Sequence, residues 1–267
     1  MARLKSNNII GVGVSAMDYD GACQEIIAAA IARQPLTVTA LAVHGVMTGA
    51  LNMGHRRRLN TLDMVLPDGQ PVRWALNLLF GSGLKDRVYG PNLMLHVCER
   101  AQKMGLSVGF YGNKSDVLDD LCSNLRVRYP DLHIATAMPS LFSRVPLSVQ
   151  SAITGEIAAS GADILFVGLG CPRQEVWLYE NRPLLSMPTI AVGAAFDFHA
   201  NRLAQAPRWM QDRGLEWLFR MVREPRRLWR RYIFLNPMFV SLLALQYVGL
   251  RRAKQTGTGD IPYVGYA

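Results

Sequence analysis

Residues 164–175 read ILFVGLGCPRQE. The apolar, partly β-branched start of this stretch is typical of a buried strand, and Pro172 suits the first turn of a following helix. Gly168 and Gly170 lie between the two and let a ligand approach the backbone closely. A strand that runs through a glycine turn into a helix is the basic unit of an α/β protein with a parallel sheet.

The same alternation of short apolar runs and helix-like segments extends over most of the chain. It predicts a Rossmann-like fold, with a largely parallel sheet and helices on both faces. Ligands of such folds bind at the carboxyl ends of the strands, so we expect the functional residues in the loops that follow the strands. The predicted strands are residues 9–14, 37–43, 64–66, 107–111, 133–137, 164–168 and 189–192, and the predicted helices lie near residues 20–33, 45–60, 70–80, 91–104, 114–128, 146–160 and 173–182.

The composition is that of a folded chain from a reducing compartment. Of the 267 residues, 50% are hydrophobic and 18% are charged, which suffices for a sizeable core and excludes disorder over most of the chain. The four cysteines, Cys23, Cys98, Cys122 and Cys171, lack the paired spacing of metal ligands, and no starting apolar run resembles a signal peptide. We therefore expect thiols rather than disulfides, in the cytosol.

Positive charge is concentrated in the last quarter of the chain. Residues 1–201 carry 17 Lys and Arg against 16 Asp and Glu, whereas residues 202–267 carry 12 against 4. We therefore predict two parts with a boundary near Asn201, an α/β domain over residues 1–201 and a basic C-terminal appendage over residues 202–267.

The appendage has the pattern of a segment that associates with a membrane. Arginines after Pro225 share one helical face, and the uncharged residues 232–250 follow. This run approaches the length of about 20 apolar residues that spans a bilayer, but Asn236 and Pro237 interrupt it. Its cationic flanks favour a segment that lies on the anionic lipids of the cytoplasmic leaflet over one that spans it. A buried C-terminal helix or a dimer interface is the alternative. The flanking cations are Arg226, Arg227, Arg230, Arg231, Arg251, Arg252 and Lys254.

A carboxylate follows the third predicted strand on a tight turn, in the sequence Leu66-Pro67-Asp68-Gly69. At the end of a strand it can point into a cleft and accept a proton from a hydroxyl nucleophile. The alternative is an aspartate that only caps the next helix.

Two further loop features suit a nucleotide. Arg87 precedes a predicted helix and can grip a phosphate with its planar guanidinium, although a solvated surface arginine is the alternative. Tyr111 and Gly112 end the next strand, where they either offer a flat ring and backbone amides to a nucleoside or form an ordinary turn.

The helix that opens at Pro172 provides free N–H groups and a partial positive charge, which suits a nucleotide diphosphate near Gly168 and Gly170. The dinucleotide-binding fingerprint is incomplete, because Arg173 stands where its third glycine is required. That pattern also has a ribose-binding acid about 20 residues further on. Asp197 occupies such a place, with a structural hydrogen bond as its alternative role.

The sequence Asp18-Tyr19-Asp20 matches the Asp-x-Asp element with which many glycosyltransferases hold a metal ion. It lies at the start of a predicted helix, where aspartates act as caps, and no nearby third ligand completes a site, so we predict no metal there or elsewhere. The chain also lacks the H-E-x-x-H, P-loop and G-x-S-x-G elements, which argues against metal-dependent proteolysis, ordinary NTP hydrolysis and α/β-hydrolase chemistry.

Several blocks follow one another in the chain: Pro67-Asp68-Gly69, residues 87–93 (RVYGPNL), Tyr111-Gly112, residues 168–175 (GLGCPRQE), 192–197 (VGAAFD), 206–210 (APRWM), 214–220 (GLEWLFR) and 223–228 (REPRRL), running on to Arg231-Tyr232. Together they resemble the WecG/TagA/CpsF family of bacterial glycosyltransferases over roughly residues 8–233. The resemblance implies a membrane-associated, inverting, metal-independent enzyme without a cofactor. Such an enzyme moves a sugar from a UDP-sugar to a polyprenyl-diphosphate-linked sugar, and the resemblance implies a peripheral or monotopic place on the cytoplasmic face of the inner membrane.

The resemblance also implies roles for single residues. Asp68 is the general base that deprotonates the acceptor hydroxyl, Gln174 positions donor or acceptor, and Arg87 contacts a diphosphate. The arginines that the family's C-terminal appendage brings to the active site correspond to Arg220, Arg227 and Arg230. The remaining residues on the donor side are Asn92, Tyr111, Gly112, Gly168, Gly170, Glu175 and Asp197.

One position departs from the family pattern. Members usually carry Thr-x-Asn at the end of the second predicted strand, where this chain has Ala40 and Ala42, followed by His44. His44 either takes over the sugar contacts or is a strand-end histidine without a ligand. The variant is more similar to the branch that builds xanthan- or acetan-type exopolysaccharide by adding a β-1,4-linked glucose than to the N-acetylmannosamine branches.

Two other functions compete with this interpretation. A nicotinamide-dependent oxidoreductase would use the glycine turn, but lacks the third glycine. A non-enzymatic membrane adaptor or nucleic-acid binder would use the basic appendage, but no nucleic-acid recognition fold is evident, so we predict no nucleic-acid partner. The sequence does not decide between a monomer, a dimer and a trimer.

Overall fold

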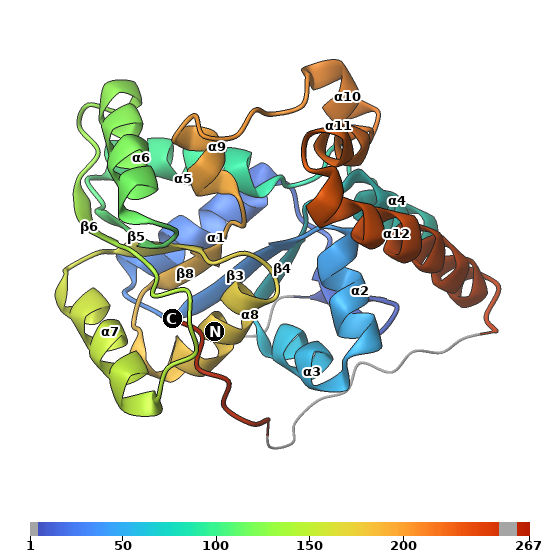
Figure 1. Cartoon of the computed structure of the whole chain (residues 1–267), viewed down its shortest axis with the longest axis horizontal. Helices are drawn as coiled ribbons and strands as arrows, with labels where there is room; N and C mark the ends of the chain where they lie inside the picture. The colour runs from blue at the N-terminus through green and yellow to red at the C-terminus, as the bar shows by residue number, and fades with distance from the viewer. Residues whose placement is uncertain (1–4, 251–260) are drawn as a thin grey trace.

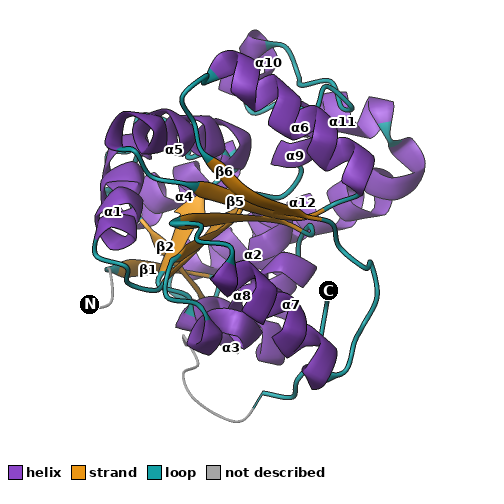
Figure 2. Ribbon diagram, turned by 90° about the vertical axis from the view of Figure 1, so that its left-hand side faces the viewer, coloured by secondary structure: helices purple, strands orange, loops and turns teal. Residues whose placement is uncertain are grey.

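The computed structural model describes residues 5–250 and 261–267, apart from the side chains of Arg227, Arg230 and Arg231. Within these residues the chain forms a parallel six-stranded sheet with helices on both faces, which confirms the predicted α/β fold class (Figures 1 and 2). In their order across the sheet, the strands are β4 (Met64–Pro67), β3 (Leu36–Leu41), β8 (Pro188–Ala191), β7 (Ile164–Gly168), β5 (Val108–Gly112) and β6 (Ile134–Met138).

Each face of the sheet has its own apolar core, because successive side chains of a strand point to opposite faces. In β7, Phe166 belongs to one core, whereas Leu165 and Val167 belong to the other. The first core includes residues of α1 (Tyr19–Ile31), α5 (Gly90–Met104), α6 (Ser115–Arg128) and α9 (Ala195–His199). The second includes residues of α2 (Val43–Leu51), α3 (Met53–Thr61), α4 (Gln70–Phe80), α7 (Leu147–Ala159) and α8 (Arg173–Asn181).

Two predicted elements differ in the structure. The strand predicted at residues 9–14 is an antiparallel hairpin of β1 (Ser6–Ile9) and β2 (Val12–Ser15), because the chain reverses at Ile10 and Gly11, which both have positive φ. The helix predicted near residues 45–60 is broken into α2 and α3. Asn52 causes the break, since its backbone is extended and its side chain caps α3 by accepting a hydrogen bond from the backbone N–H of His55, at 2.8 Å.

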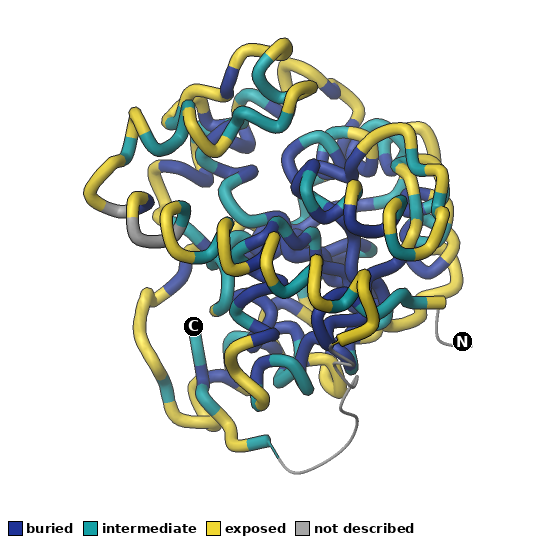
Figure 3. The backbone as a smooth tube through the Cα atoms, turned by 90° about the vertical axis from the view of Figure 1, so that its right-hand side faces the viewer, coloured by how far each residue is buried: buried dark blue, intermediate teal, exposed yellow. Residues whose placement is uncertain are grey.

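The C-terminal region forms three helices that close over one end of the sheet. They are α10 (Arg208–Asp212), α11 (Glu216–Arg223) and α12 (Pro225–Tyr247), and α12 runs beside α2 (Figure 1). Exposed and half-buried residues make up α10 and α11, while buried residues gather in the interior of the molecule (Figure 3). Among the described helices, none is both long enough and apolar enough to cross a membrane.

Side chains of α12 tie it to the rest of the molecule. Leu228 and Phe239 are each 1% exposed, and Phe239 belongs to the second core. At its far end, Gln246 accepts a hydrogen bond from the backbone N–H of Ile10 and donates one to the backbone carbonyl of Asn8, at 2.8 and 2.7 Å. The helix therefore packs directly against the residues before 201.

Residues 261–267 pack against α8 and the loop that follows β6. Glu180 of α8 accepts hydrogen bonds from the backbone N–H groups of Val264 and Gly265, and Ser140 donates its hydroxyl to the carbonyl of Ala267. The terminal residue is 3% exposed. The end of the chain is thus held by specific contacts.

Candidate active site

Two adjoining cavities lie at the carboxyl ends of the strands, where the sequence predicted the functional residues. The larger has a volume of about 660 Å³ and is lined by the loops that follow β3, β4, β5, β7 and β8. The smaller, of about 110 Å³, lies between the start of α4 and the helices α11 and α12. The residues that line both cavities are Ala42, His44, Asp68, Tyr89 and Arg220.

Asp68 lies at the junction of the two cavities. Its backbone N–H donates a hydrogen bond to the carbonyl of Leu41, at 3.1 Å, which fixes the turn after β4 to the end of β3. Gly69, not Asp68, is the N-cap of α4, so the helix-capping alternative is wrong. The carboxylate Oδ1 is buried and has no hydrogen-bond partner among the described residues. An acceptor without a partner beside a cavity is suited to a ligand's hydroxyl group.

The surroundings of Asp68 raise its pKa to about 7. Burial is the largest cause, since the charged form loses its hydration. The negative charge of Glu216 acts in the same direction, whereas Arg87 and Arg220 lower the pKa. A carboxyl group that titrates near neutral pH can take up a proton during a reaction.

Arg87 is held by an ion pair that links the body to the C-terminal helices. It is 8% exposed, so the alternative of a solvated surface arginine is wrong. Its Nη2 donates to Glu216 Oε2 of α11, at 2.5 Å, and its guanidinium lies over the ring of Tyr89, 4.4 Å from the centroid. Glu216 was not among the predicted site residues. Its place in the block GLEWLFR was the signal that could have found it.

The glycine turn after β7 forms one wall of the larger cavity. Gly170 has a φ of +75°, and a Cβ on Gly168 would lie 2.5 Å from the ring of Phe196, so both positions require glycine. Gln174 is 1% exposed and bridges two loops, because it accepts from the backbone N–H of Gly193, at 3.1 Å, and donates to Glu175 Oε1, at 2.9 Å. Gln174 therefore lines the larger cavity and holds the loop after β8 against the start of α8.

Four of the predicted donor-side residues do not line either cavity. Tyr111 is fully buried and packs on Trp177, with ring centroids 4.9 Å apart, so the prediction that it offers its ring to a nucleoside is wrong. Gly112 is pressed against the backbone of Gly168, and its neighbour Asn113 lines the larger cavity instead. Glu175 is fully buried behind the wall, and Asn92 borders a separate hollow beside His199.

The other predicted residues do reach the cavities. Asp197, in α9, lines the larger one, and its backbone carbonyl accepts from the N–H groups of Arg202 and Leu203. His44, in the first turn of α2, lines both. Arg220 also lines both, and its buried Nε has no hydrogen-bond partner in the described part of the chain. The side chains of Arg227 and Arg230 lie outside the described residues.

The Asp-x-Asp match has a structural explanation. Asp18 caps α1 by accepting from the backbone N–H of Gly21, at 2.9 Å, and Asp20 pairs with Arg100. Both aspartates therefore have structural partners. None of the four cysteines, which all lie within the described residues, forms a disulfide, as predicted.

Comparison with known proteins assigns the chain to a protein family. The family model described as "Glycosyl transferase WecG/TagA/CpsF family" matches residues 7–253. Two curated relatives are each named "N-acetylglucosaminyldiphosphoundecaprenol N-acetyl-beta-D-mannosaminyltransferase". The one from Bacillus spizizenii is 29% identical over 184 residues, 68% of this chain and 68% of the relative. The one from Bacillus subtilis strain 168 is 28% identical over 186 residues, 69% of this chain and 70% of the relative.

Proposed function

Because the chain belongs to the WecG/TagA/CpsF family of glycosyltransferases, we propose that it moves a sugar from a UDP-sugar to a sugar carried on polyprenyl diphosphate. The product would enter bacterial surface or exopolysaccharide. The relatives, whose names specify an undecaprenyl-diphosphate-linked acceptor, support this proposal. The observation that carries it is the unpartnered carboxylate oxygen of Asp68 at the junction of two cavities.

The two cavities suit two substrates that meet at Asp68. In the proposed reaction the donor occupies the larger cavity and the acceptor sugar enters through the smaller one, beside Trp217, Tyr232 and Asn236. The acceptor hydroxyl gives its proton to Asp68, and its oxygen bonds to the anomeric carbon as the bond from that carbon to the diphosphate breaks. A single displacement of this kind inverts the anomeric carbon.

Negative charge develops on the departing UDP and must be stabilised by cations. The stabilisation of charge that develops in a transition state is often the largest contribution to catalysis. Arg220 contributes a cation to both cavities and has only a long ion pair, 3.9 Å from Glu224, whereas Arg87 pairs closely with Glu216, at 2.5 Å. The N-terminus of α8, with Pro172 as its N-cap, adds backbone N–H groups. We propose that these groups, with Arg227 and Arg230, replace a metal ion at the diphosphate, and that no cofactor is needed.

The sugar is proposed to be glucose or an N-acetylmannosamine-type residue. The names of the relatives support N-acetylmannosamine. The Ala42 and His44 variant, which the structure places on both cavities beside Asp68, supports the glucosyl branch. A small alanine leaves room at this point, and His44 can donate a hydrogen bond to a sugar hydroxyl.

We further propose that residues 202–267 hold the enzyme on the cytoplasmic face of the inner membrane. Exposed apolar side chains on α12 support this, with Trp229, Ile233 and Phe234 being 41%, 54% and 59% exposed. Basic residues nearby would attract anionic lipids.

A donor screen tests the reaction. UDP-glucose, UDP-N-acetylmannosamine and UDP-N-acetylmannosaminuronate are each incubated with synthetic prenyl-diphosphate-sugar acceptors, and the new anomeric centre is assigned by NMR. We expect one donor to react, with inversion, in the presence of EDTA. Retention of configuration, or an EDTA block that Mg²⁺ or Mn²⁺ relieves, would contradict the proposed mechanism.

A further inference from the structure

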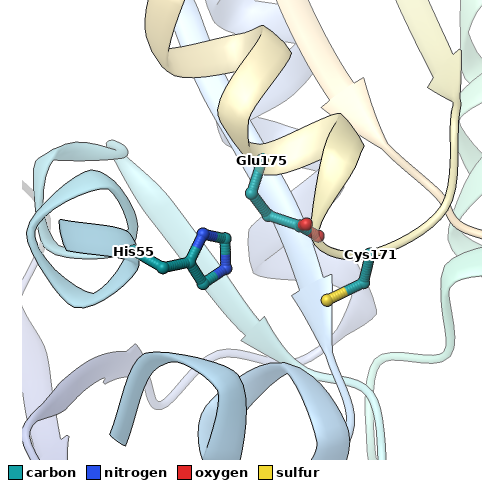
Figure 4. Close-up of side chains that lie close together, drawn as sticks. All are labelled: His55, Cys171 and Glu175. Carbon is teal, nitrogen blue, oxygen red and sulfur yellow. The ribbon is translucent and has the colours of Figure 1, made fainter. Parts of the chain in front are cut away.

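Three side chains with metal-ligating atoms converge behind the glycine wall of the larger cavity (Figure 4). They are His55 in the first turn of α3, Cys171 in the loop after β7 and Glu175 in the first turn of α8. One ligand atom from each side chain lies within 4.8 Å of the other two. Folding thus brings a nitrogen, a sulfur and a carboxylate oxygen to one point from three separate segments.

Two of these atoms are buried acceptors or donors without a partner. His55 is 4% exposed and Glu175 is fully buried. His55 Nε2 and Glu175 Oε2 have no hydrogen-bond partner among the described residues. Buried polar groups are nearly always paired, because an unpaired one loses its bonds to water without replacement. The Cys171 thiol hydrogen-bonds to the Glu175 side chain, so a metal ion would take the place of that thiol proton. The ion would also give His55 Nε2 and Glu175 Oε2 the partner that each lacks among the described residues.

The surrounding hydrogen bonds orient the carboxylate for this role. Thr39 Oγ1 and Gln174 Nε2 donate to Glu175 Oε1, at 3.0 and 2.9 Å, which leaves Oε2 as the oxygen to bind a ligand. Partners of this kind around metal-binding side chains fix their orientation and contribute to affinity. The backbone of His55 is fixed as well, because its N–H donates a hydrogen bond to the side chain of Asn52, the N-cap of α3.

We propose that His55, Cys171 and Glu175 together bind one zinc-class divalent ion. Zinc accepts nitrogen, thiolate and carboxylate ligands, whereas magnesium and calcium prefer oxygen alone. Bonds of about 2.0–2.3 Å in a tetrahedral site place ligand atoms roughly 3.3–3.8 Å apart, so small side-chain rotations that shorten the present spacing would supply three of the four ligands. Thiolate and carboxylate balance the charge of the ion, and the thiol proton leaves to solvent.

The ion would connect α3 and α8 to the loop that shapes the larger cavity. Cys171 lines that cavity, so a fourth coordination position there would be open to water or to an anion. The proposed ligands are protein side chains, and Asp68 is not one of them. The ion would therefore differ from a metal that bridges the donor diphosphate. The proposal does not rest on the transfer reaction, because its test uses the metal alone.

Cobalt substitution tests the site in the full chain. Chelator-treated protein is titrated with Co²⁺, then with Zn²⁺, and the absorption spectrum is recorded. We expect one Co²⁺ per chain, with the thiolate-to-cobalt charge-transfer band and the visible bands of tetrahedral coordination, all displaced by Zn²⁺. Zn²⁺ should also raise the melting temperature of the apoprotein.

Variants locate the bound ion. Cys171→Ser should abolish the thiolate band, and His55→Gln should weaken binding by more than about 10-fold, since even outer partners of ligands contribute 10–100-fold. Cys122→Ser and His199→Gln, elsewhere in the fold, are the controls and should bind as the wild type does. Circular dichroism verifies that each apoprotein folds. If His55→Gln does not fold, Cys171→Ser, at a partly exposed position, still tests the site. A wild-type titration without the thiolate band, or a band that survives in Cys171→Ser, overturns the proposal.

Discussion

Asp68 combines an acceptor without a partner and a raised pKa, and both follow from its burial at the end of β4. Replacement by asparagine keeps the size of the side chain but removes the base. We expect Asp68→Asn to lower kcat by about 10²–10⁴-fold, the usual contribution of a general base. Initial rates with the donor found in the screen measure this. Asp20→Asn is the control and should retain activity, because Asp20 pairs with Arg100 on the surface. Near-normal turnover of Asp68→Asn would remove Asp68 from this role.

The same substitution should stabilise the protein at alkaline pH. Asp68 has a pKa of about 7 in the folded chain against 3.8 for the unperturbed group. Between these values the unfolded chain binds fewer protons than the folded one, so wild-type stability falls as pH rises from about 4 to 7. Asp68→Asn does not titrate. Urea unfolding at pH 8 should show the variant more stable by on the order of 1 kcal/mol or more, with the advantage diminishing towards pH 4.

Glu216 sets part of the pKa of Asp68 from another segment of the chain. Its negative charge raises that pKa and also engages Arg87. In Glu216→Gln, Arg87 is left to act on Asp68 alone, so the pKa of Asp68 should fall. Because the base must be ionised, the acidic limb of the kcat profile should move to lower pH. A loss of activity without any movement of that limb would show that Glu216 only holds α11 in place. Glu156→Gln, at an exposed position of α7 that lines neither cavity, is the control and should leave that limb where it is in the wild type.

Among the helices and strands, those with strong local patterns were predicted and those set by a single backbone conformation were not. Six of the seven predicted strands correspond to the six strands of the parallel sheet, because their apolar runs have the length and composition of buried β-structure. The hairpin at Ile10 and Gly11 was missed, since an isoleucine with positive φ has no sequence signal. The break at Asn52 was missed because no proline marks it and the residues on both sides of it are compatible with a helix.

The turn after β7 allows a test of how closely its elements pack. A Cβ on Gly168 would lie 2.5 Å from the Phe196 ring, whereas Gly155 of α7 has open space around its Cα. Gly168→Ala should therefore lower the free energy of unfolding by about 1–3 kcal/mol, as overpacked cores do. Gly155→Ala should raise it by about 0.5–1 kcal/mol, because alanine favours the helix. Urea denaturation of both variants measures the difference. Equal effects would mean that the strand ends adjust freely.

In the molecule as a whole, the part of the site that lies at the strand ends was predicted from the sequence, and the ion pair between Arg87 and the C-terminal helices was not. Gly168 ends a strand, and Asp68, Gly170 and Asp197 come after strands, so the parallel sheet brings these residues to the same edge. The pairing of Arg87 with Glu216 depends on how the C-terminal helices fold back over the sheet, which no local pattern indicates. Tyr111 was misplaced because the side of the strand it faces is decided by packing on Trp177.

The C-terminal helices are expected to complete the site as well as to bind lipid. They contribute Arg220 to both cavities and Glu216 to the smaller one. A chain ending near Asn201 should therefore lose most activity and also lose sedimentation with anionic liposomes. Circular dichroism verifies that the shortened chain folds, since removing Phe239 uncovers part of the second core. Full activity of the shortened chain would contradict a role for these helices in the site.

Full-length variants separate lipid binding from completion of the site. Ile233 and Phe234 are 54% and 59% exposed and line neither cavity. Replacing both with serine removes apolar surface that would insert into lipid, while Arg220 and Glu216 stay in place. Liposome sedimentation should fall, and transfer to a short-chain, water-soluble acceptor should remain near wild type. If sedimentation is unchanged, a different face of the molecule contacts the membrane. If transfer to the soluble acceptor falls with it, these side chains support the site itself, because a lipid-binding surface has no part in a reaction without a bilayer.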